Sequence, residues 1–131
     1  MPTRVIAAVI ERNGLFLVCR RPDDKRHGGL WEFPGGKLEQ GESAFEGTRR
    51  ELEEELGVQV KEVAPTLFSV ADPGSDVVIE FTPTTIRGLP QALEHSEIRW
   101  TDLAALQLLD LAPSDRRFVE YLTPLRVAAK E

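Results

Sequence analysis

The chain has 131 residues, of which 41% are hydrophobic and 29% are charged, and its formal net charge at pH 7 is −6. These values are ordinary for a globular chain, and the length predicts a single domain, residues 1–131, with a sizeable core. The acidic balance argues against a nucleic-acid polymer held by charge alone, but it allows a small phosphate ligand if a cation mediates.

Three features bear on location and assembly. No apolar run approaches the ~20 residues that span a bilayer, so we expect no membrane partner. The N-terminal stretch reaches Glu11 and Arg12 after a short apolar run and lacks a secretory cleavage pattern. The one cysteine, Cys19, excludes an internal disulfide and suits a reducing compartment. We therefore expect a cytoplasmic protein, and the sequence does not decide between a monomer and a homodimer.

The first third of the chain predicts short strands and turns. Residues 4–10 and 15–20 are expected to form strands, and Asn13-Gly14 between them is a strong hairpin signal. The polar stretch 21–29 predicts a loop. The run 30–33 is short and apolar, and we expect residues 34–36, Pro-Gly-Gly, to break the chain after it.

The clearest helix follows. Ser43 with Glu46 three residues later is a capping-box pattern, and Gly57 is a natural C-terminal stop. At 100° per residue, one face gathers three apolar side chains that we expect to meet the core: Phe45, Leu52 and Leu56.

Another face of the same helix gathers Glu51, Glu54 and Glu55, which are neighbours at spacing i, i+3 and i+4, whereas Glu53 points elsewhere, towards solvent. Each like-charge pair costs about 0.2–0.5 kcal/mol in an isolated helix. Two interpretations are compatible with this cost. The glutamates form a solvated face neutralised by Arg49 and Arg50, or they bind a hard cation such as Mg²⁺ or Mn²⁺.

The second half of the chain predicts further strands and a final helix. Residues 63–70 and 77–86 are expected to be strands joined by a turn at 71–76, with Pro83 marking an edge or a bulge. Residues 98–101 are a shorter strand candidate. We expect Ser114 to cap a helix that runs through Leu122 and is stopped by Pro124. Mixed strands with two or three helices predict an α/β layered domain.

The segment 36–58 decides between the two interpretations of the acidic helix. It reads glycine, five residues, glutamate, seven residues, and then Arg-Glu-apolar-x-Glu-Glu-x-Gly-apolar. This pattern resembles the complete signature of the Nudix hydrolases, and a chance match at a given start has a probability on the order of one in a billion. The flanking stretches GLWEFPGGK, EHSEIRW and LAPSD resemble the MutT-like branch of nucleoside triphosphate pyrophosphohydrolases.

The resemblance covers most of the chain and implies the Nudix α/β/α sandwich, with a mixed sheet between helices. It also implies metal-dependent hydrolysis of a nucleoside triphosphate to a monophosphate and pyrophosphate, in a role such as nucleotide-pool sanitising and DNA repair. The ligands of Mg²⁺ or Mn²⁺ that it implies are Glu51, Glu54, Glu55 and the carbonyl group of Gly35.

The resemblance also implies catalytic roles. Arg50 is expected to pair with a glutamate of the motif and orient it. The proton acceptor for water is either Glu51 or Glu94, the latter matching a downstream acidic residue that is a metal ligand or a base in relatives. Glu42 is expected to support the loop or to reach the metal through water.

Four residues are candidates for substrate binding. Arg21 lies where MutT-like enzymes place a substrate-contacting arginine, with Arg20 as an alternative, and Lys37 is placed to touch phosphate. Phe33 is equally compatible with a nucleobase pocket and with the core. Asp115 replaces an asparagine found in some guanine-selective relatives, and an ionised aspartate only accepts hydrogen bonds. This difference leaves the base open between 8-oxo-dGTP and a cytosine nucleotide.

Two rival functions remain at this point. Pro73 lies fifteen residues after Val58, as a proline does in ADP-ribose pyrophosphatases, but the turn at 71–76 explains a proline equally well. The other rival is a catalytically silent nucleotide sensor. Such degenerate relatives usually lose glutamates of the motif, and all of them are present in this chain.

Overall fold

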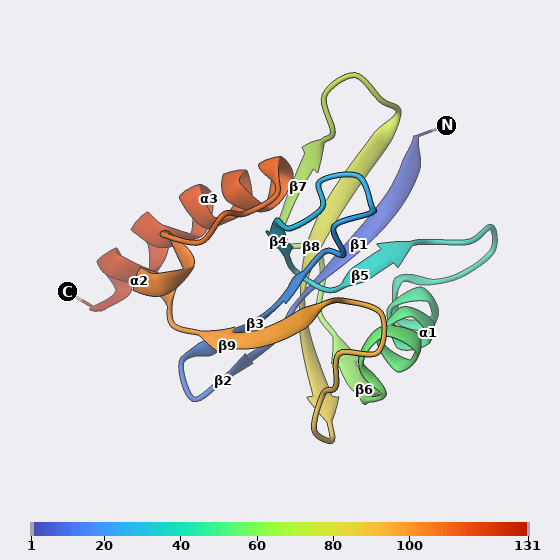
Figure 1. The fold of residues 1–131 in the computed structure, drawn as a ribbon, viewed down its shortest axis with the longest axis horizontal. Helices are drawn as coiled ribbons and strands as arrows, with labels where there is room; N and C mark the ends of the chain where they lie inside the picture. Colours follow the sequence, from blue (N-terminus) through green and yellow to red (C-terminus); the bar gives the residue numbers. More distant parts are fainter. Residues whose placement is uncertain (1, 131) are drawn as a thin grey trace.

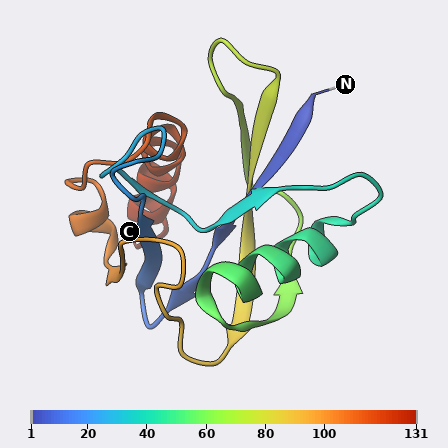
Figure 2. The same ribbon diagram turned by 45° about the vertical axis from the view of Figure 1, so that its right-hand side comes forward.

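The computed structural model describes residues 2–130 and arranges them as two sheets with helices on opposite sides (Figures 1 and 2). In chain order the elements are β1 (Thr3–Val9), β2 (Glu11–Arg12), β3 (Leu15–Arg20), β4 (Trp31–Glu32), β5 (Gly35–Lys37), α1 (Ala44–Leu56), β6 (Gln59–Val63), β7 (Phe68–Ala71), β8 (Val77–Arg87), β9 (Glu97–Thr101), α2 (Leu103–Leu106) and α3 (Pro113–Lys130).

The larger sheet is mixed. Its order is β5-β1-β8-β6, and β7 also pairs with β8. β1 and β8 run parallel, with Thr3 opposite Val77 and Val9 opposite Pro83, whereas the other pairs are antiparallel. The smaller sheet has the order β2-β3-β4, with β9 antiparallel to β3. Asn13 and Gly14 form the β2–β3 turn with positive φ angles of 52° and 77°, so the hairpin prediction is confirmed.

Two apolar layers hold the helices to the sheets. One includes three aromatic side chains, Phe33, Phe81 and Phe118, with Phe81 and Phe118 stacked at 4.5 Å between ring centroids. The other layer packs Leu52 and Leu56 of α1 against β1, β3 and β6. Full burial of side chains of this size contributes about 1.5–3 kcal/mol each. The expected α/β/α sandwich with a mixed sheet is confirmed, and α1 and α3 lie on opposite sides of it (Figure 1).

The helix α1 begins and ends as its sequence predicts. The Ser43 hydroxyl accepts a hydrogen bond from the Glu46 N–H group, and the Glu46 carboxylate accepts one from the Ser43 N–H group. Gly57 closes the helix with φ 68°. Leu52 and Leu56 are fully buried, but Phe45 is 40% exposed, so its expected place in the core is wrong. Phe45 lies in the first turn and lines a surface pocket with Arg49 and with Val60 of β6.

Several strand boundaries differ from their predictions. The expected strand 63–70 is two strands, because β8 pairs with β6 along one part of its length and with β7 along another. Pro83 lies where this change of partner occurs, so it marks neither an edge nor a bulge of β8; its missing N–H group is tolerated there. The expected break at residues 34–36 is also wrong, because Gly35 and Gly36 pair with β1 as part of β5.

The final helix differs at both ends from its prediction. Pro113 opens it, which suits a residue without an N–H group, so Ser114 is inside the helix and is not its cap. The helix also continues past Pro124. Pro124 is exposed, and so is Glu120, whose carbonyl group the proline leaves without a donor, so water can satisfy that carbonyl. Beyond it, Arg126 donates two hydrogen bonds to Glu11 and anchors the last turns.

Within residues 2–130, none of the helices combines the length and the apolar character needed to cross a membrane.

Candidate functional site

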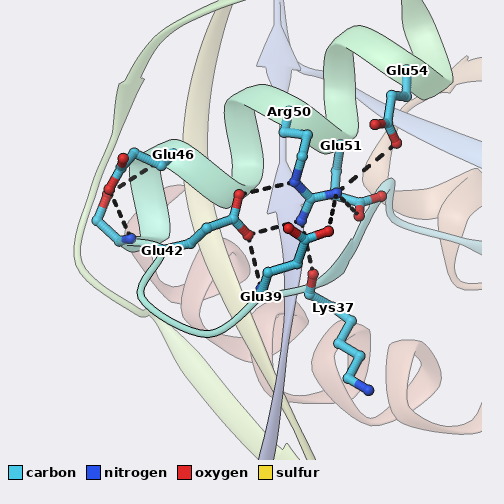
Figure 3. Close-up of polar contacts among 8 residues, drawn as sticks. Lys37, Glu39, Glu42, Glu46, Arg50, Glu51 and Glu54 are labelled. Atoms are coloured by element: carbon cyan, nitrogen blue, oxygen red, sulfur yellow. Dashed lines mark hydrogen bonds and ion pairs between the residues drawn. The ribbon is translucent and has the colours of Figure 1, made fainter.

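Arg50 organises the carboxylates beside the start of α1. Its Nε and Nη2 atoms donate to the two oxygens of Glu42 at 2.9 Å each, and Nη1 donates to Glu51 at 2.7 Å. Nη2 also donates to the Lys37 carbonyl group, and Nη1 lies 4.0 Å from Glu54 (Figure 3). These contacts raise the pKa of Arg50 and lower that of Glu42 to about 2. The predicted pairing of Arg50 with a motif glutamate is therefore present.

Glu42 supports the loop before α1, which is one of the two roles considered for it. In addition to its contacts with Arg50, its carboxylate accepts a hydrogen bond from the Glu39 N–H group at 2.8 Å. The Arg50 guanidinium group also donates to the Lys37 carbonyl group, so the loop, the end of β5 and the helix α1 are all bonded to one side chain.

Glycines allow the glutamates to approach the backbone of β5. A Cβ atom on Gly36 would lie 2.4 Å from Glu51 Oε2, and a Cβ atom on Gly35 would lie 1.9 Å from the Ile6 carbonyl oxygen. Gly35 also has φ 150°, a conformation that residues with side chains rarely adopt. A larger residue at Gly36 would therefore push β5 away from Glu51 of the helix, and one at Gly35 would push it away from the backbone of β1.

The three glutamates that we call the acidic face, Glu51, Glu54 and Glu55, differ in exposure. Glu54 is exposed, Glu51 is half-buried, and Glu55 is only 5% exposed. Burial, together with the hydrogen bond to Glu51 and the charges of Glu51 and Glu32, raises the pKa of Glu55 well above its ordinary value. The Gly35 N–H group, 3.5 Å from Glu55 Oε1, partly opposes this shift.

The residues present fit a divalent ion by their chemistry. Carboxylate and carbonyl oxygens are the ligands that Mg²⁺ and Mn²⁺ prefer, and a cation beside Glu55 would favour its ionised form, which burial and the neighbouring carboxylates disfavour. Among the described residues, no group of three or more Asp, Glu, His or Cys side chains is already arranged as a metal site. Glu51 instead points one oxygen at Arg50.

Two predicted residues lie apart from these contacts. The Lys37 side chain is exposed and points away from the carboxylates, and only its backbone carbonyl joins the network (Figure 3). Glu94 is exposed in the loop before β9, and its side chain makes no hydrogen bond or ion pair with residues 2–130. The loop is nevertheless tied to α1, because Leu93 N–H donates to the Glu55 carbonyl group at 3.1 Å.

Asp115 lies in a second region, at the start of α3. Its Oδ1 atom accepts a hydrogen bond of 2.9 Å from the Phe33 N–H group, and its side chain is 6% exposed. Burial is the main cause that raises the pKa of Asp115 to about 8, and the charge of Glu32 adds to it. The Phe33 ring packs edge-on against Phe81 and Phe118, so the ring belongs to the core while the backbone of Phe33 faces Asp115.

Asp115 and Arg21 line the same cavity, of about 190 Å³, which we call the α3 pocket. Arg21 donates from Nη1 to both oxygens of Glu32, at 3.1 and 3.2 Å, and from Nε to the Arg26 carbonyl group. Arg20, the alternative, donates from Nε to the Gly29 carbonyl group and does not line this pocket. The geometry therefore favours Arg21 over Arg20.

Sequence reasoning missed two residues of this region and undervalued a third. Glu32 holds Arg21, and Ser114 places beside the α3 pocket a buried hydroxyl that has no hydrogen-bond partner within residues 2–130. The side chain of His95, in the loop before β9, lies buried between Glu32 and Glu55. The one available signal was Glu32 itself, an acidic residue enclosed by Trp31 and Phe33 in an otherwise apolar run.

Known families and proteins resemble this chain along most of its length. The NUDIX domain family matches residues 1–122. The CTP pyrophosphohydrolase of Escherichia coli strain K12 is 36% identical over 127 residues, which are 95% of this chain and 93% of that protein. The putative 8-oxo-dGTP diphosphatase 2 of Mycobacterium tuberculosis strain H37Rv is 36% identical over 124 residues, covering 88% of this chain and 84% of the relative.

Solved structures agree with the sequence matches. The solution structure of the E. coli ORF135 protein superposes with a TM-score of 0.81 at 36% identity and covers 96% of this chain and 91% of its own. The crystal structure of a MutT NUDIX hydrolase from Burkholderia pseudomallei gives a TM-score of 0.77 at 27% identity, covering 92% and 97%. The chain therefore belongs to the NUDIX domain family and is a hydrolase.

Proposed function

We propose that this chain hydrolyses (deoxy)nucleoside triphosphates to a nucleoside monophosphate and pyrophosphate, using Mg²⁺ or Mn²⁺ held at the acidic face of α1. The observation that carries the proposal is the arrangement around Arg50. One guanidinium group fixes Glu42 and Glu51 and lies near Glu54, while Glu55 is buried on the same face of the helix, where burial and Glu51 raise its pKa. In this proposal Glu51, Glu54 and Glu55 hold the ion, together with the carbonyl group of Gly35.

A cation is needed because both the site and the substrate are anionic. A triphosphate would be repelled by carboxylates that it met directly, so the two must be joined by positive charge. The chemistry that a divalent ion supplies when bound is neutralisation of phosphate charge and a lowered pKa of water. Arg50 keeps Glu51 in place, and Gly36 leaves room for the Glu51 carboxylate close to β5.

Two residues are candidates for the proton acceptor. Water attacks a phosphorus atom of the triphosphate, the bond to the pyrophosphate group breaks, and the proton of water passes to a carboxylate. Glu51 is held by Arg50, whereas Glu94 is exposed in a loop bonded to α1. Glu94→Gln decides between them: if Glu94 is the base, kcat falls by about 10²–10⁴-fold, whereas if Glu51 is the base, kcat stays near wild type. Glu51→Gln alone does not decide, because it also removes a proposed ligand of the ion. We expect activity to rise from acidic towards neutral or alkaline pH, since carboxylates must be ionised to act.

The α3 pocket is the proposed site of the nucleoside. Arg21 has two of its guanidinium nitrogens occupied, and Nη2 makes no hydrogen bond with residues 2–130, which leaves it available to the substrate. Asp115 faces the pocket with one oxygen on Phe33 N–H, so its other oxygen is available to a base. The amino group of a cytosine, or the N–H and amino edge of an 8-oxoguanine, would donate to an ionised Asp115, whereas the protonated form, which its raised pKa favours at neutral pH, would donate to an oxo group of the base. Lys37 is the exposed candidate for the phosphates.

The similarity of the relatives supports the same two substrates. The CTP pyrophosphohydrolase and the putative 8-oxo-dGTP diphosphatase are each 36% identical to this chain. We therefore propose a cytosine nucleotide or 8-oxo-dGTP, in a nucleotide-pool sanitising role. No observation favours ADP-ribose, because Pro73 lies in the turn before β8, where a proline is common. The silent sensor is disfavoured because every glutamate of the motif is present.

A substrate panel tests the proposal most broadly. Normal and oxidised nucleoside triphosphates and ADP-ribose are compared by kcat/KM, and the products are identified by chromatography. We expect a triphosphate to lead the panel, with monophosphate and pyrophosphate in equal amounts. Preference for ADP-ribose would overturn the choice of substrate. Hydrolysis that persists in excess EDTA would overturn the metal requirement.

A further inference from the structure

His95 occupies a position between the two regions of the site. Its side chain is only 7% exposed, although the loop that carries it is otherwise largely exposed. Nε2 lies 3.0 Å from Glu32 Oε2, and Nδ1 lies 3.7 Å from Glu55 Oε1. Glu55 belongs to the acidic face of α1, whereas Glu32 holds Arg21 at the α3 pocket. The imidazole ring thus contacts a carboxylate of each region.

Backbone hydrogen bonds hold the loop of His95 on both sides. On one side Gln91 N–H donates to the Leu56 carbonyl group and Leu93 N–H to the Glu55 carbonyl group. On the other side Ser96 N–H donates to the Arg20 carbonyl group at 3.0 Å. The ring is therefore fixed both to the end of α1 and to the end of β3, the strand that leads into Arg21.

The hydrogen bond from His95 completes the environment of Glu32. An ionised carboxylate only accepts hydrogen bonds, so Nε2 carries the proton and donates to Oε2. Both oxygens of Glu32 also accept from Arg21 Nη1. Arg21 Nε also donates to the Arg26 carbonyl group, so two nitrogens of the guanidinium group are held and its orientation is fixed. Nη2 is the nitrogen that bonds neither Glu32 nor Arg26. Loss of the His95 bond would free Glu32 to rotate and Arg21 to follow it.

We propose that His95 is a positioning residue that acts through Glu32 to hold Arg21 against the nucleotide, at a set distance from the acidic face. The proposal rests on the proposed function, because it takes Arg21 as the residue that contacts substrate. It adds Glu32 and His95 to the machinery as residues that touch neither phosphate nor ion. Partners of this kind change activity by about 10–100-fold when they are removed.

The alternative is that His95 only fills space beneath its loop. His95→Phe keeps a ring but removes both nitrogens, and His95→Gln keeps an N–H donor. If positioning matters, we expect His95→Phe to lower kcat/KM for the best triphosphate by about 10–100-fold, mainly by raising KM. In His95→Gln the fold-loss of kcat/KM should be no greater than the square root of the loss in His95→Phe. A space-filling role predicts the reverse order, with phenylalanine the better replacement.

Glu32→Gln and the double variant His95→Phe/Glu32→Gln complete the test. Because both residues act on Arg21 by one route, the double variant should be no more than about 3-fold worse than the poorer single variant. Direct Mn²⁺ binding without nucleotide, followed by electron paramagnetic resonance, should stay within about 3-fold of wild type in His95→Phe, because His95 Nδ1 lies 3.7 Å from Glu55 Oε1 and makes no hydrogen bond to this proposed ligand within residues 2–130.

The outcomes separate this inference from the proposed function. If the wild-type chain hydrolyses no triphosphate, the proposed function fails. If it does, but His95→Phe matches wild type or the two single losses multiply in the double variant, the positioning role fails. If His95→Phe does not fold, Glu32→Gln and His95→Gln, which keep the side-chain size, decide the question. If Glu32→Gln raises KM more than His95→Gln does, the proposal is supported. If Glu32→Gln leaves KM unchanged, the proposal is contradicted.

Discussion

The acidic face of α1 and the α3 pocket both present carboxylates, but the two regions deal with the charge in opposite ways. On α1, Arg50 lowers the pKa of Glu42 and keeps Glu51 paired at a half-exposed surface. At the start of α3, burial raises the pKa of Asp115 to about 8, so that its neutral form is favoured at neutral pH. The first environment keeps charge available for cations, and the second keeps a hydrogen-bonding group for a neutral base.

Glu55 belongs to the first region by its position and resembles the second by its burial. Its pKa is raised by burial and by Glu51 and Glu32, yet it lies on the same helix as the exposed Glu54. A buried carboxylate in this position is stabilised in its charged form only when a cation is near. Glu55 is therefore the residue at which the difference between the two regions can be tested most severely.

The largest expected effect follows from Glu55→Gln. The change removes a proposed ligand and keeps the side-chain shape, so we expect kcat to fall by about 10²–10⁴-fold while the fold and Tm are preserved. Steady-state kinetics and thermal unfolding measure the two quantities. Glu53→Gln is the matched control, because Glu53 lies on the same helix but is exposed and points elsewhere. Equal losses in both variants would show that general helix charge, and not the acidic face, supports activity.

A smaller effect is expected from Arg50→Met. The variant frees Glu42 and Glu51 from their common partner, so we expect activity to fall by about 10–100-fold and the Mg²⁺ concentration needed for half-maximal activity to change. A titration of activity with Mg²⁺ measures both. Arg49→Met removes a neighbouring exposed charge that makes no hydrogen bond or ion pair with residues 2–130, and it should behave as wild type. If Arg49→Met reproduces the loss, the effect is one of net charge alone.

The smallest effect on turnover, and a distinct effect on stability, is expected from Asp115→Asn. The pKa of Asp115 is raised on folding from its ordinary value of 3.8 to about 8, so the stability that it contributes at low pH is lost as the pH rises between these values. Each pH unit in this window costs at most about 1.4 kcal/mol. Asparagine does not titrate, so we expect the variant to gain stability over wild type between pH 5 and pH 8.

Chemical denaturation of both proteins at pH 5 and pH 8 measures this gain, and a stability difference that is the same at both pH values would count against the buried, neutral aspartate. The same variant should change the ranking of cytosine and 8-oxoguanine nucleotides, because the amide offers both donors and an acceptor.

The regions that sequence reasoning described well are those where local signals decide the structure. The capping box at Ser43 and the glycine at position 57 determine the ends of α1, and the i, i+3, i+4 spacing places Glu51, Glu54 and Glu55 together. The hairpin at Asn13-Gly14 is likewise local. The motif from Gly36 to Val58 was sufficient to identify the family, since its residues lie close together along the chain.

Features that depend on distant parts of the chain were missed. β8 exchanges one antiparallel partner for another at Pro83, and no local pattern contains this information. α3 continues past Pro124, and its last turns are held by the contact of Arg126 with Glu11, 115 residues away along the chain. The contact of His95 with Glu32 and Glu55 joins three separate segments, and only the fold brings them together.

Binding of Mn²⁺ in the absence of nucleotide tests the central account most directly. Electron paramagnetic resonance or calorimetry would compare the wild-type chain with Glu55→Gln and Glu53→Gln at one pH. The account predicts that wild type and Glu53→Gln bind the ion alike and that Glu55→Gln binds it at least ~10-fold more weakly. Equal affinity in all three proteins would contradict the assignment of the acidic face of α1 as the metal site.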